Sequence, residues 1–199
     1  MFLALLLTSL SPLASKRGKS RRRKKISVAS IVNIRKDLFL KGSGQFGVFL
    51  SSFSVSHAVP EETGIERLVK DIHIETEKIK RNRLYIRSVA ELRTAVFLIR
   101  SFFKKRKKRF YAKYFPLWGG ITNINLNTLW SDTGNTVPVD YLRAVSTGHA
   151  TPLVFSFTTV NDKINVGVSY RKTVFSEADI ERIICVFRES AESPGKTKE

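Results

Sequence analysis

The sequence predicts an α/β fold in which a layered sheet packs against helices. Segments rich in β-branched residues alternate along the chain with segments whose apolar residues recur at helical spacing, and this alternation is typical of such a sheet. The chain has 199 residues, of which 42% are hydrophobic, so it can bury one sizeable core or two small ones. No internal repeat is visible in the sequence.

The first half of the chain predicts two strands and two helices. Residues 26–34 form a predicted strand, and a glycine turn at residues 40–49 leads to a second strand at about 48–55. An amphipathic helix follows within residues 60–80, and another is expected at about residues 88–108. The first of these helices is expected to be capped by Thr63 with Glu66. The turn contains Gly42, Gly44 and Gly47, which permit positive φ.

The second half predicts a strand, a hairpin and a last helix. Residues 118–126 form a glycine-led strand, and residues 151–175 contain two β-rich runs around an Asn-Asp pair. Ser176 is the expected N-cap of the last helix, with Asp179 at its third position. Residues 191–199 are expected to be a disordered tail. The inner face of the last helix should comprise Ile180, Ile183, Ile184 and Phe187.

Residues 1–14 are apolar almost all round, which leaves two interpretations. A buried helix is favoured, because a secretory signal begins with basic residues, whereas here the basic residues follow the apolar stretch. Such a helix belongs in the middle of a larger protein, and residues 15–25 would then form a basic loop after it. A signal peptide, and with it a secreted basic protein, is the alternative.

The residues with reactive side chains form no combination of a nucleophile with a base. His57, His73 and His149 are scattered, and each fits a structural role better than general-base chemistry. Cys185 lies between two apolar residues of the last helix and is expected to be an inert core thiol. A single cysteine excludes an intramolecular disulfide, and no metal site or covalently bound cofactor is predicted. No run approaches the roughly 18 apolar residues that span a bilayer.

Four stretches of the chain resemble a known family. They are VNIR (32–35), GQFGVFLSSF (44–53), GGITNINL (119–126) and residues 151–183, which begin TPLVFSFTTV. In sequence and order they are similar to the C-terminal half of the chloramphenicol-acetyltransferase-like acyltransferases, which include the condensation domains of peptide synthetases. The resemblance covers residues 1–190 and implies the C-terminal subdomain of the CoA-dependent acyltransferase fold. The implied organisation is a buried helix (1–14), a variable basic loop (15–25), the sheet with its helices (26–190) and the tail (191–199).

The resemblance implies acyl transfer from a thioester to an alcohol or an amine. Family members carry their catalytic base in an H-H-x-x-x-D motif of the N-terminal half, and this sequence contains no H-H pair. We therefore expect one wall of a substrate channel, inactive alone, with acyl-CoA or an acyl-carrier thioester as co-substrate. The expected partner is an N-terminal half that carries the motif. A truncated gene, one subunit of a split enzyme and a repurposed paralogue remain open as origins.

Two sets of residues correspond to motifs of the family, and no catalytic residue is assigned. Thr122 and Asn123 match the (S/T)-N position beside the family's reaction centre, where a hydrogen bond to substrate or to a developing oxyanion is expected. Strand residues that only pair with neighbouring backbone are the alternative. A structural role, in the turn or at the interface between halves, is expected for Asn33, Arg35, Gly44 and Gly47.

The formal net charge of +18 comes almost entirely from two basic strips. Residues 16–25 carry eight basic residues and residues 100–113 carry eight more, with no acidic residue in either. Such strips bind anionic lipid or nucleic acid, or are solvated loops and helix ends. The second strip follows an apolar stripe from Val89 to Phe103, which is typical of a helix on a membrane surface. The expected anion-binding residues are Lys104, Lys105, Arg106, Lys107, Lys108 and Arg109.

This charge supports a second class of function, a basic adaptor on a membrane surface or on nucleic acid. Nucleic acid is the less supported partner, because no recognised nucleic-acid-binding motif accompanies the charge. Lipid-handling acyltransferases would also use a basic helix, so the two classes are compatible. The expected location is the cytoplasm, with peripheral attachment to an anionic membrane.

Overall fold

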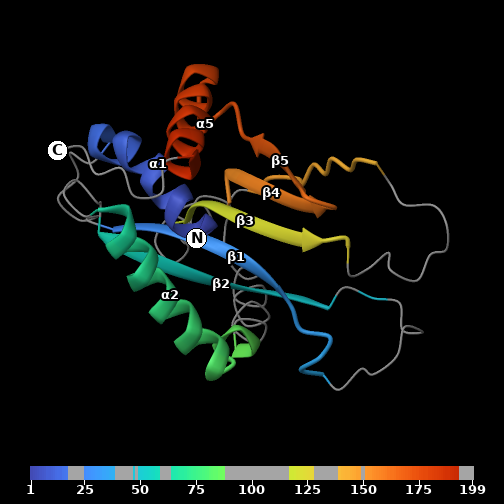
Figure 1. Ribbon diagram of the computed structural model, residues 1–199. Helices are drawn as coiled ribbons and strands as arrows, with labels where there is room; N and C mark the ends of the chain where they lie inside the picture. The colour runs from blue at the N-terminus through green and yellow to red at the C-terminus, as the bar shows by residue number, and fades with distance from the viewer. Residues whose placement is uncertain are drawn as a thin grey trace, which may run out of the picture.

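The fold is a five-stranded mixed sheet with helices packed on one face, as the computed structural model shows (Figure 1). The structure describes residues 1–17, 25–38, 47, 49–58, 64–87, 117–127, 139–148 and 151–192. The predicted α/β fold is therefore confirmed. Among these residues, no helix combines the length and apolarity needed to cross a membrane. The elements are α1 (Phe2–Arg17), β1 (Lys25–Asn33), β2 (Leu50–Ala58), α2 (Ile65–Arg81), β3 (Leu117–Asn125), β4 (Leu153–Val160), β5 (Lys163–Tyr170) and α5 (Glu177–Glu192).

The strands lie side by side in the order β2-β1-β3-β4-β5. The central pairs β1–β3 and β3–β4 are parallel, whereas β2 pairs with β1 and β5 pairs with β4 in the antiparallel sense. The last pair is the predicted hairpin. Its turn places Asn161 at a φ of 53°, a left-handed conformation that asparagine tolerates better than most residues.

The core lies between the sheet and the layer formed by α1, α2 and α5 (Figure 1). Phe157 of β4 stacks on Phe2 of α1 with ring centroids 4.1 Å apart, and Phe155 lies 5.1 Å from Phe187 of α5. α1 contacts α2 and α5 as well as β1 and β3, so it is enclosed on several sides. This enclosure explains why α1 needs no polar face. Its most deeply buried side chains, at most 2% exposed, include Leu5, Leu6, Leu7 and Leu10.

The two amphipathic helices face the core with the residues that their spacing predicts. Leu68 and Ile72 of α2 are buried, as are the predicted inner residues of α5 except Ile184, which is partly buried. α5 begins with the predicted capping box: Ser176 Oγ accepts the N–H of Asp179, and Asp179 Oδ2 accepts the N–H of Ser176, each at 3.1 Å.

The predicted cap of α2 is wrong, because the helix begins one residue later. Its N-cap is Gly64, which makes no side-chain cap hydrogen bond. The Gly64 carbonyl instead accepts the N–H of Leu68 at 3.2 Å, and glycine is among the residues that occupy N-cap positions well.

Four predicted boundaries also differ from the structure. The basic loop expected at residues 15–25 is wrong at both ends, because α1 continues to Arg17 and β1 begins at Lys25. Lysine and arginine are good helix formers and are favoured near a helix C-terminus, where the dipole is negative. α5 continues to Glu192, past the predicted start of the tail. β2 ends three residues after the predicted 55, since alternating burial continues along it.

Candidate functional site

The candidate site lies on the face of the sheet opposite α1, α2 and α5, which we call the strap face. Successive residues of a strand point to opposite faces, and Phe155 and Phe157 point toward the helices, so Ser156 and Thr158 point to the strap face. Residues paired across neighbouring strands share a face. Pairing therefore adds Thr122, Asn165 and Gly167 to the strap face.

Residues 139–148, which we call the strap, run beside β4 and β5 on this face (Figure 1). Side-chain hydrogen bonds fasten the strap to the sheet. Ser156 Oγ donates to the carbonyl oxygen of Arg143 at 2.6 Å and lies 3.0 Å from the carbonyl oxygen of Gly167. Asn165 Nδ2 donates to the carbonyl oxygen of Tyr141 at 3.1 Å and also contacts Asp140 Oδ1.

Glycine is required at position 167 because the strap passes directly over it. A Cβ atom at Gly167 would lie 2.3 Å from the carbonyl oxygen of Arg143 and 2.7 Å from Ser156 Oγ. Both distances are shorter than any ordinary contact, and the first involves backbone, which cannot rotate away. The close approach of the strap thus depends on the missing side chain.

Thr122, one of the predicted site residues, lies under the side chain of Arg143. Arg143 Nη2 donates to three oxygens: the Thr122 carbonyl at 3.2 Å, Thr122 Oγ1 at 3.4 Å and the Phe157 carbonyl at 3.3 Å. Thr122 is only 6% exposed, so its hydroxyl meets the guanidinium rather than bulk solvent. The arrangement brings a cation to the strap face at the junction of β3 and β4.

The charge of Arg143 has no carboxylate partner among the described residues. Burial lowers the pKa of Arg143, and the nearby Tyr141 opposes that effect. Arg143 Nε is buried without a hydrogen-bond partner, and so is Thr158 Oγ1, whose residue is 1% exposed. Because buried polar groups are nearly always paired, two such atoms on one face indicate a site short of acceptors.

Thr122 and Asn123 do not face one site. Asn123 pairs with Phe157 across β3 and β4 and therefore points to the helix side of the sheet, where it is exposed near the end of β3. The side chains of Thr122 and Asn123 thus lie near the same end of β3 but on opposite faces of the sheet. A ligand at the end of β3 could contact both, whereas a ligand on the strap face could contact Thr122 alone.

The predicted structural residues Asn33 and Arg35 are involved in the turn after β1. Asn33 Oδ1 accepts the N–H of Arg35 at 3.0 Å, and the Arg35 guanidinium lies 4.4 Å from the ring centroid of Phe49. Gly47 does not use the positive φ that glycine permits. A Cβ atom at Gly47 would instead lie 3.0 Å from ring atoms of Phe49.

Several predicted residues lie outside the described part of the chain. They include Gly44, His149 and the basic residues Lys104, Lys105, Arg106, Lys107, Lys108 and Arg109. Their roles stay predictions. Within the described ranges, no three His, Cys, Asp or Glu side chains are grouped as metal ligands would be.

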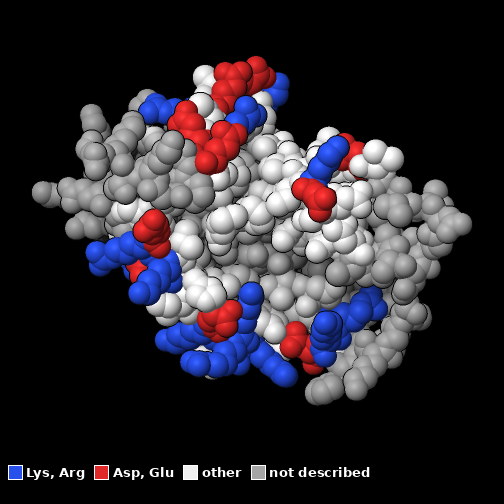
Figure 2. All heavy atoms as spheres, in the orientation of Figure 1, with Lys and Arg blue, Asp and Glu red and all other residues white. Residues whose placement is uncertain are grey.

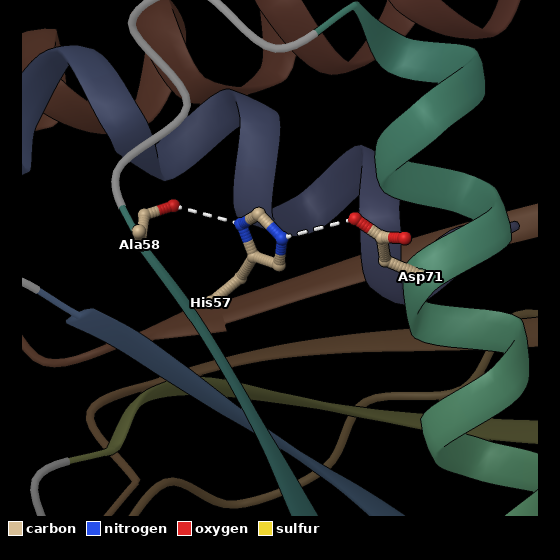
Figure 3. A network of polar contacts seen from close by, with 3 residues as sticks. All are labelled: His57, Ala58 and Asp71. Atoms are coloured by element: carbon tan, nitrogen blue, oxygen red, sulfur yellow. Dashed lines mark hydrogen bonds and ion pairs between the residues drawn. The ribbon is translucent and has the colours of Figure 1, made fainter.

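His57 joins β2 to α2, as the close view in Figure 3 shows. Its Nδ1 lies 2.9 Å from the carbonyl oxygen of Ala58, and its Nε2 lies 3.6 Å from Asp71 Oδ2. Both ring nitrogens therefore have a neighbour, which agrees with the predicted structural role. Glu75 lies one turn after Asp71, and burial raises its pKa, while His57 and Lys25 oppose that effect.

The prediction of a buried Cys185 is wrong, because the side chain is exposed on α5. Its Sγ donates to Glu189 Oε1 at 3.2 Å, and this hydrogen bond raises the pKa of the thiol. Its apolar neighbours in sequence are misleading in a helix. Residues 180, 183 and 187 point inward, and residue 185 falls on the other side.

Charged side chains are unevenly distributed over the visible surface (Figure 2). Acidic residues gather over α5, whose first turn contains Glu177 and Asp179. Basic residues gather over α2 and the turn after it. The last turn of α2 contains Lys78, Lys80 and Arg81. The described part of the chain thus presents opposite charges at two ends of the helical layer.

Sequence reasoning did not identify Arg143, Ser156, Asn165 or Gly167 as parts of one cluster. The strap has neither strand nor helix periodicity, and Arg143 is 21 residues from Thr122. The glycine in the middle of β5 was an available signal, since glycine inside a strand often marks close approach of another backbone.

Comparison with solved structures identifies a similar fold, whereas no protein-family model and no curated protein matches the chain. The chain is similar to a structure described as the molecular basis for condensation domain-mediated chain release from the enacyloxin polyketide synthase. The match has a TM-score of 0.56 and 10% identity, and covers 99% of this chain. Weaker similarity links it to the first condensation domain of the CDA synthetase, with a TM-score of 0.46, 15% identity and 98% coverage of this chain.

The match to the enacyloxin structure shows the fold of part of a condensation domain, which confirms the predicted fold family. The chain spans 37% of the length of the enacyloxin structure and 40% of the CDA synthetase structure. Activity, substrates and partners of such whole domains are therefore proposals for this chain.

Proposed function

We propose that this chain forms one wall of a substrate channel in an acyltransferase that moves an acyl group from a thioester to an alcohol or an amine. The observation that supports the proposal is the fold, since nearly the whole chain matches part of a condensation-domain structure. That structure concerns chain release from a polyketide synthase. Following the sequence resemblance, the chain would be the C-terminal half of such a domain.

In the proposed reaction the acceptor oxygen or nitrogen attacks the thioester carbonyl, and the carbon–sulfur bond breaks. A general base accepts the acceptor's proton, and the thiolate leaves and is protonated. The base would be the second histidine of an H-H-x-x-x-D motif on a complementary polypeptide, because this sequence contains no H-H pair. The end of β3, with Thr122 and Asn123, would line the channel. Acyl-CoA or an acyl-carrier thioester would be the co-substrate.

The test is an acyl-transfer assay with and without a complementary polypeptide. The DNA upstream of Met1 is read for a frame that encodes H-H-x-x-x-D, and its product is purified with this chain. Acetyl-CoA and an acyl-N-acetylcysteamine thioester serve as donors, and products are measured by mass spectrometry. The chain alone should stay at background, and the pair should be active. Changing the second histidine of the motif to alanine should reduce the rate by about 10²–10⁴-fold.

Turnover by the chain alone that is lost in the His57→Ala variant would contradict the proposal, because the base would then belong to this chain. His73→Ala is the matched control, since His73 is exposed on α2. Absence of turnover in every pairing, together with no association between the two polypeptides, would also count against a channel between two halves.

Attachment to an anionic membrane is a second candidate, supported by the basic strip at residues 100–113. Each basic residue near an anionic bilayer contributes roughly 1 kcal/mol, and this attraction is screened by salt. Replacing the six basic residues from Lys104 to Arg109 by glutamine should abolish flotation with phosphatidylserine vesicles. Binding that persists in the variant, or in about 1 M salt where the Debye length is about 3 Å, would indicate hydrophobic insertion instead.

A further inference from the structure

We propose that Arg143 binds an anionic oxygen of a ligand on the strap face, with Thr122 as its positioning residue. The ligand oxygen would belong to a phosphate or a carboxylate. The site itself is inferred from the contacts of Arg143. Only its placement in a substrate channel rests on the proposed function.

The charge of the Arg143 guanidinium is poorly compensated where it lies. The guanidinium donates to neutral oxygens, two carbonyls and one hydroxyl, and no carboxylate among the described residues lies within ion-pair distance. Arg143 is half-buried, and removing part of a charge from water without an opposite charge nearby is unfavourable. The strap is already fastened by Ser156 and Asn165, so a neutral side chain at position 143 would hold it without that cost.

Part of the hydrogen-bonding capacity of the Arg143 guanidinium is unused within the described residues. A guanidinium has five N–H donors in a planar fork, which suits an oxygen pair of a carboxylate or phosphate. Within the described residues, Arg143 donates hydrogen bonds through Nη2 alone, and its buried Nε has no acceptor. Thr158 Oγ1, on the same face and next to the Phe157 carbonyl that Arg143 contacts, is also without a partner. Nη1 makes no hydrogen bond within the described residues and is not among the buried unpartnered atoms, so an anionic oxygen there would supply the opposite charge that the guanidinium lacks.

Thr122 fixes the direction of this fork. Its carbonyl and hydroxyl oxygens both accept from Nη2, and β3 holds them between β1 and β4. With Nη2 anchored on the sheet, the rest of the guanidinium is held in one orientation. A residue held in this way discriminates between anions by geometry, whereas a freely moving lysine would not.

The experiment follows the Nε–Hε resonance of Arg143 by NMR in the full chain while sodium phosphate is added at constant ionic strength. The resonance is assigned by its absence from the Arg143→Lys variant. We expect a saturable shift in the wild type. Arg143→Gln should bind phosphate at least about tenfold more weakly, since a hydrogen bond to a charged group is worth roughly 1.5–3 kcal/mol. Arg182→Gln, on exposed α5, is the charge-matched control and should bind as the wild type does.

Two further sets of measurements test the positioning role of Thr122 and the chemical source of the anionic oxygen. Thr122→Val keeps the shape but removes Oγ1, and should move the Nε–Hε resonance and weaken phosphate binding while Arg143 remains present. Acetate tests a carboxylate source. Coenzyme A against pantetheine, which lacks the phosphates, tests a phosphate source. If Arg143→Gln does not fold, the wild-type titration still shows whether phosphate shifts the Nε–Hε resonance in a saturable way, and the Arg143→Lys variant still assigns that resonance.

A shift that does not saturate, or an equal effect of Arg143→Gln and Arg182→Gln, would overturn the proposal and leave only attraction to the net positive charge. Phosphate binding at Arg143 without acyl transfer by any pairing would retain this site and refute the proposed function. Acyl transfer without anion binding at Arg143 would support the proposed function and refute this site.

Discussion

The substitution Gly167→Ala tests whether the strap is held as closely as its contacts indicate. Alanine is normally better than glycine inside a strand, by roughly 0.5–1 kcal/mol, because it loses less conformational freedom on folding. At this position the new Cβ would lie 2.3 Å from the Arg143 carbonyl oxygen. Cβ contacts below 3.0 Å do not occur in practice, so the strap must move by at least the difference, about 0.7 Å.

A movement of that size affects the hydrogen bonds of Arg143 first. The contacts of Nη2 with Thr122 and Phe157 are already 3.2–3.4 Å long, and they would pass the limit of a hydrogen bond. Hydrogen bonds from a charged donor contribute roughly 1.5–3 kcal/mol, so after the intrinsic gain from alanine a net loss of about 1–2 kcal/mol is expected.

Urea denaturation measures this loss in the free energy of unfolding, and hydrogen exchange by mass spectrometry measures local protection in residues 117–127 and 139–148. Gly120→Ala is the matched control. Its Cβ would also point to the strap face, but its nearest contact is the Thr151 methyl group at 3.2 Å, which can move. Its effect should be smaller. A Gly167→Ala protein as stable as the wild type, with unchanged exchange in the strap, would contradict the close approach of the strap to β5.

Three further predictions concern the helical layer. Leu6→Ala in α1 should lower the free energy of unfolding by about 2–5 kcal/mol in urea denaturation, because Leu6 is fully buried; a change below that range would contradict the packing of α1. Ser176→Ala should cost about 1 kcal/mol through loss of the α5 cap, and Ser176→Asp should restore it, as thermal denaturation would show. Burial raises the pKa of Glu75, so its contribution to stability is present below its ordinary pKa of 4.5 and is lost as pH rises through the raised value. Glu75→Gln should therefore be more stable than the wild type at pH 7 but not at pH 4. The gain should be a few tenths of a kcal/mol, because the side chain is largely solvated. Glu181→Gln, at an exposed position on α5, is the control.

Most of the elements, and the inner faces of the helices, could be predicted from local patterns in the sequence. Runs rich in β-branched and aromatic residues, with glycine or Asn-Asp turns beside them, indicated β1, β3 and the β4–β5 hairpin. Helical spacing indicated the buried residues of α2 and α5. The capping box of Ser176 and Asp179 was also readable, because its two hydrogen bonds join residues three positions apart. The order of these elements was sufficient to predict the fold family that the structural comparison shows.

The meeting of polar groups on the strap face could not be predicted from the sequence, because it depends on how distant segments pack. The contact of Arg143 with Thr122 joins residues 21 positions apart, and the strap that carries Arg143 has no periodic pattern. The pairing of His57 with Asp71 likewise depends on how α2 lies against β2. Local propensity acts through neighbours along the chain and so specifies strands, helices and caps. Contacts between distant segments depend on how those elements pack, which is why the site around Arg143 became visible only in the folded chain.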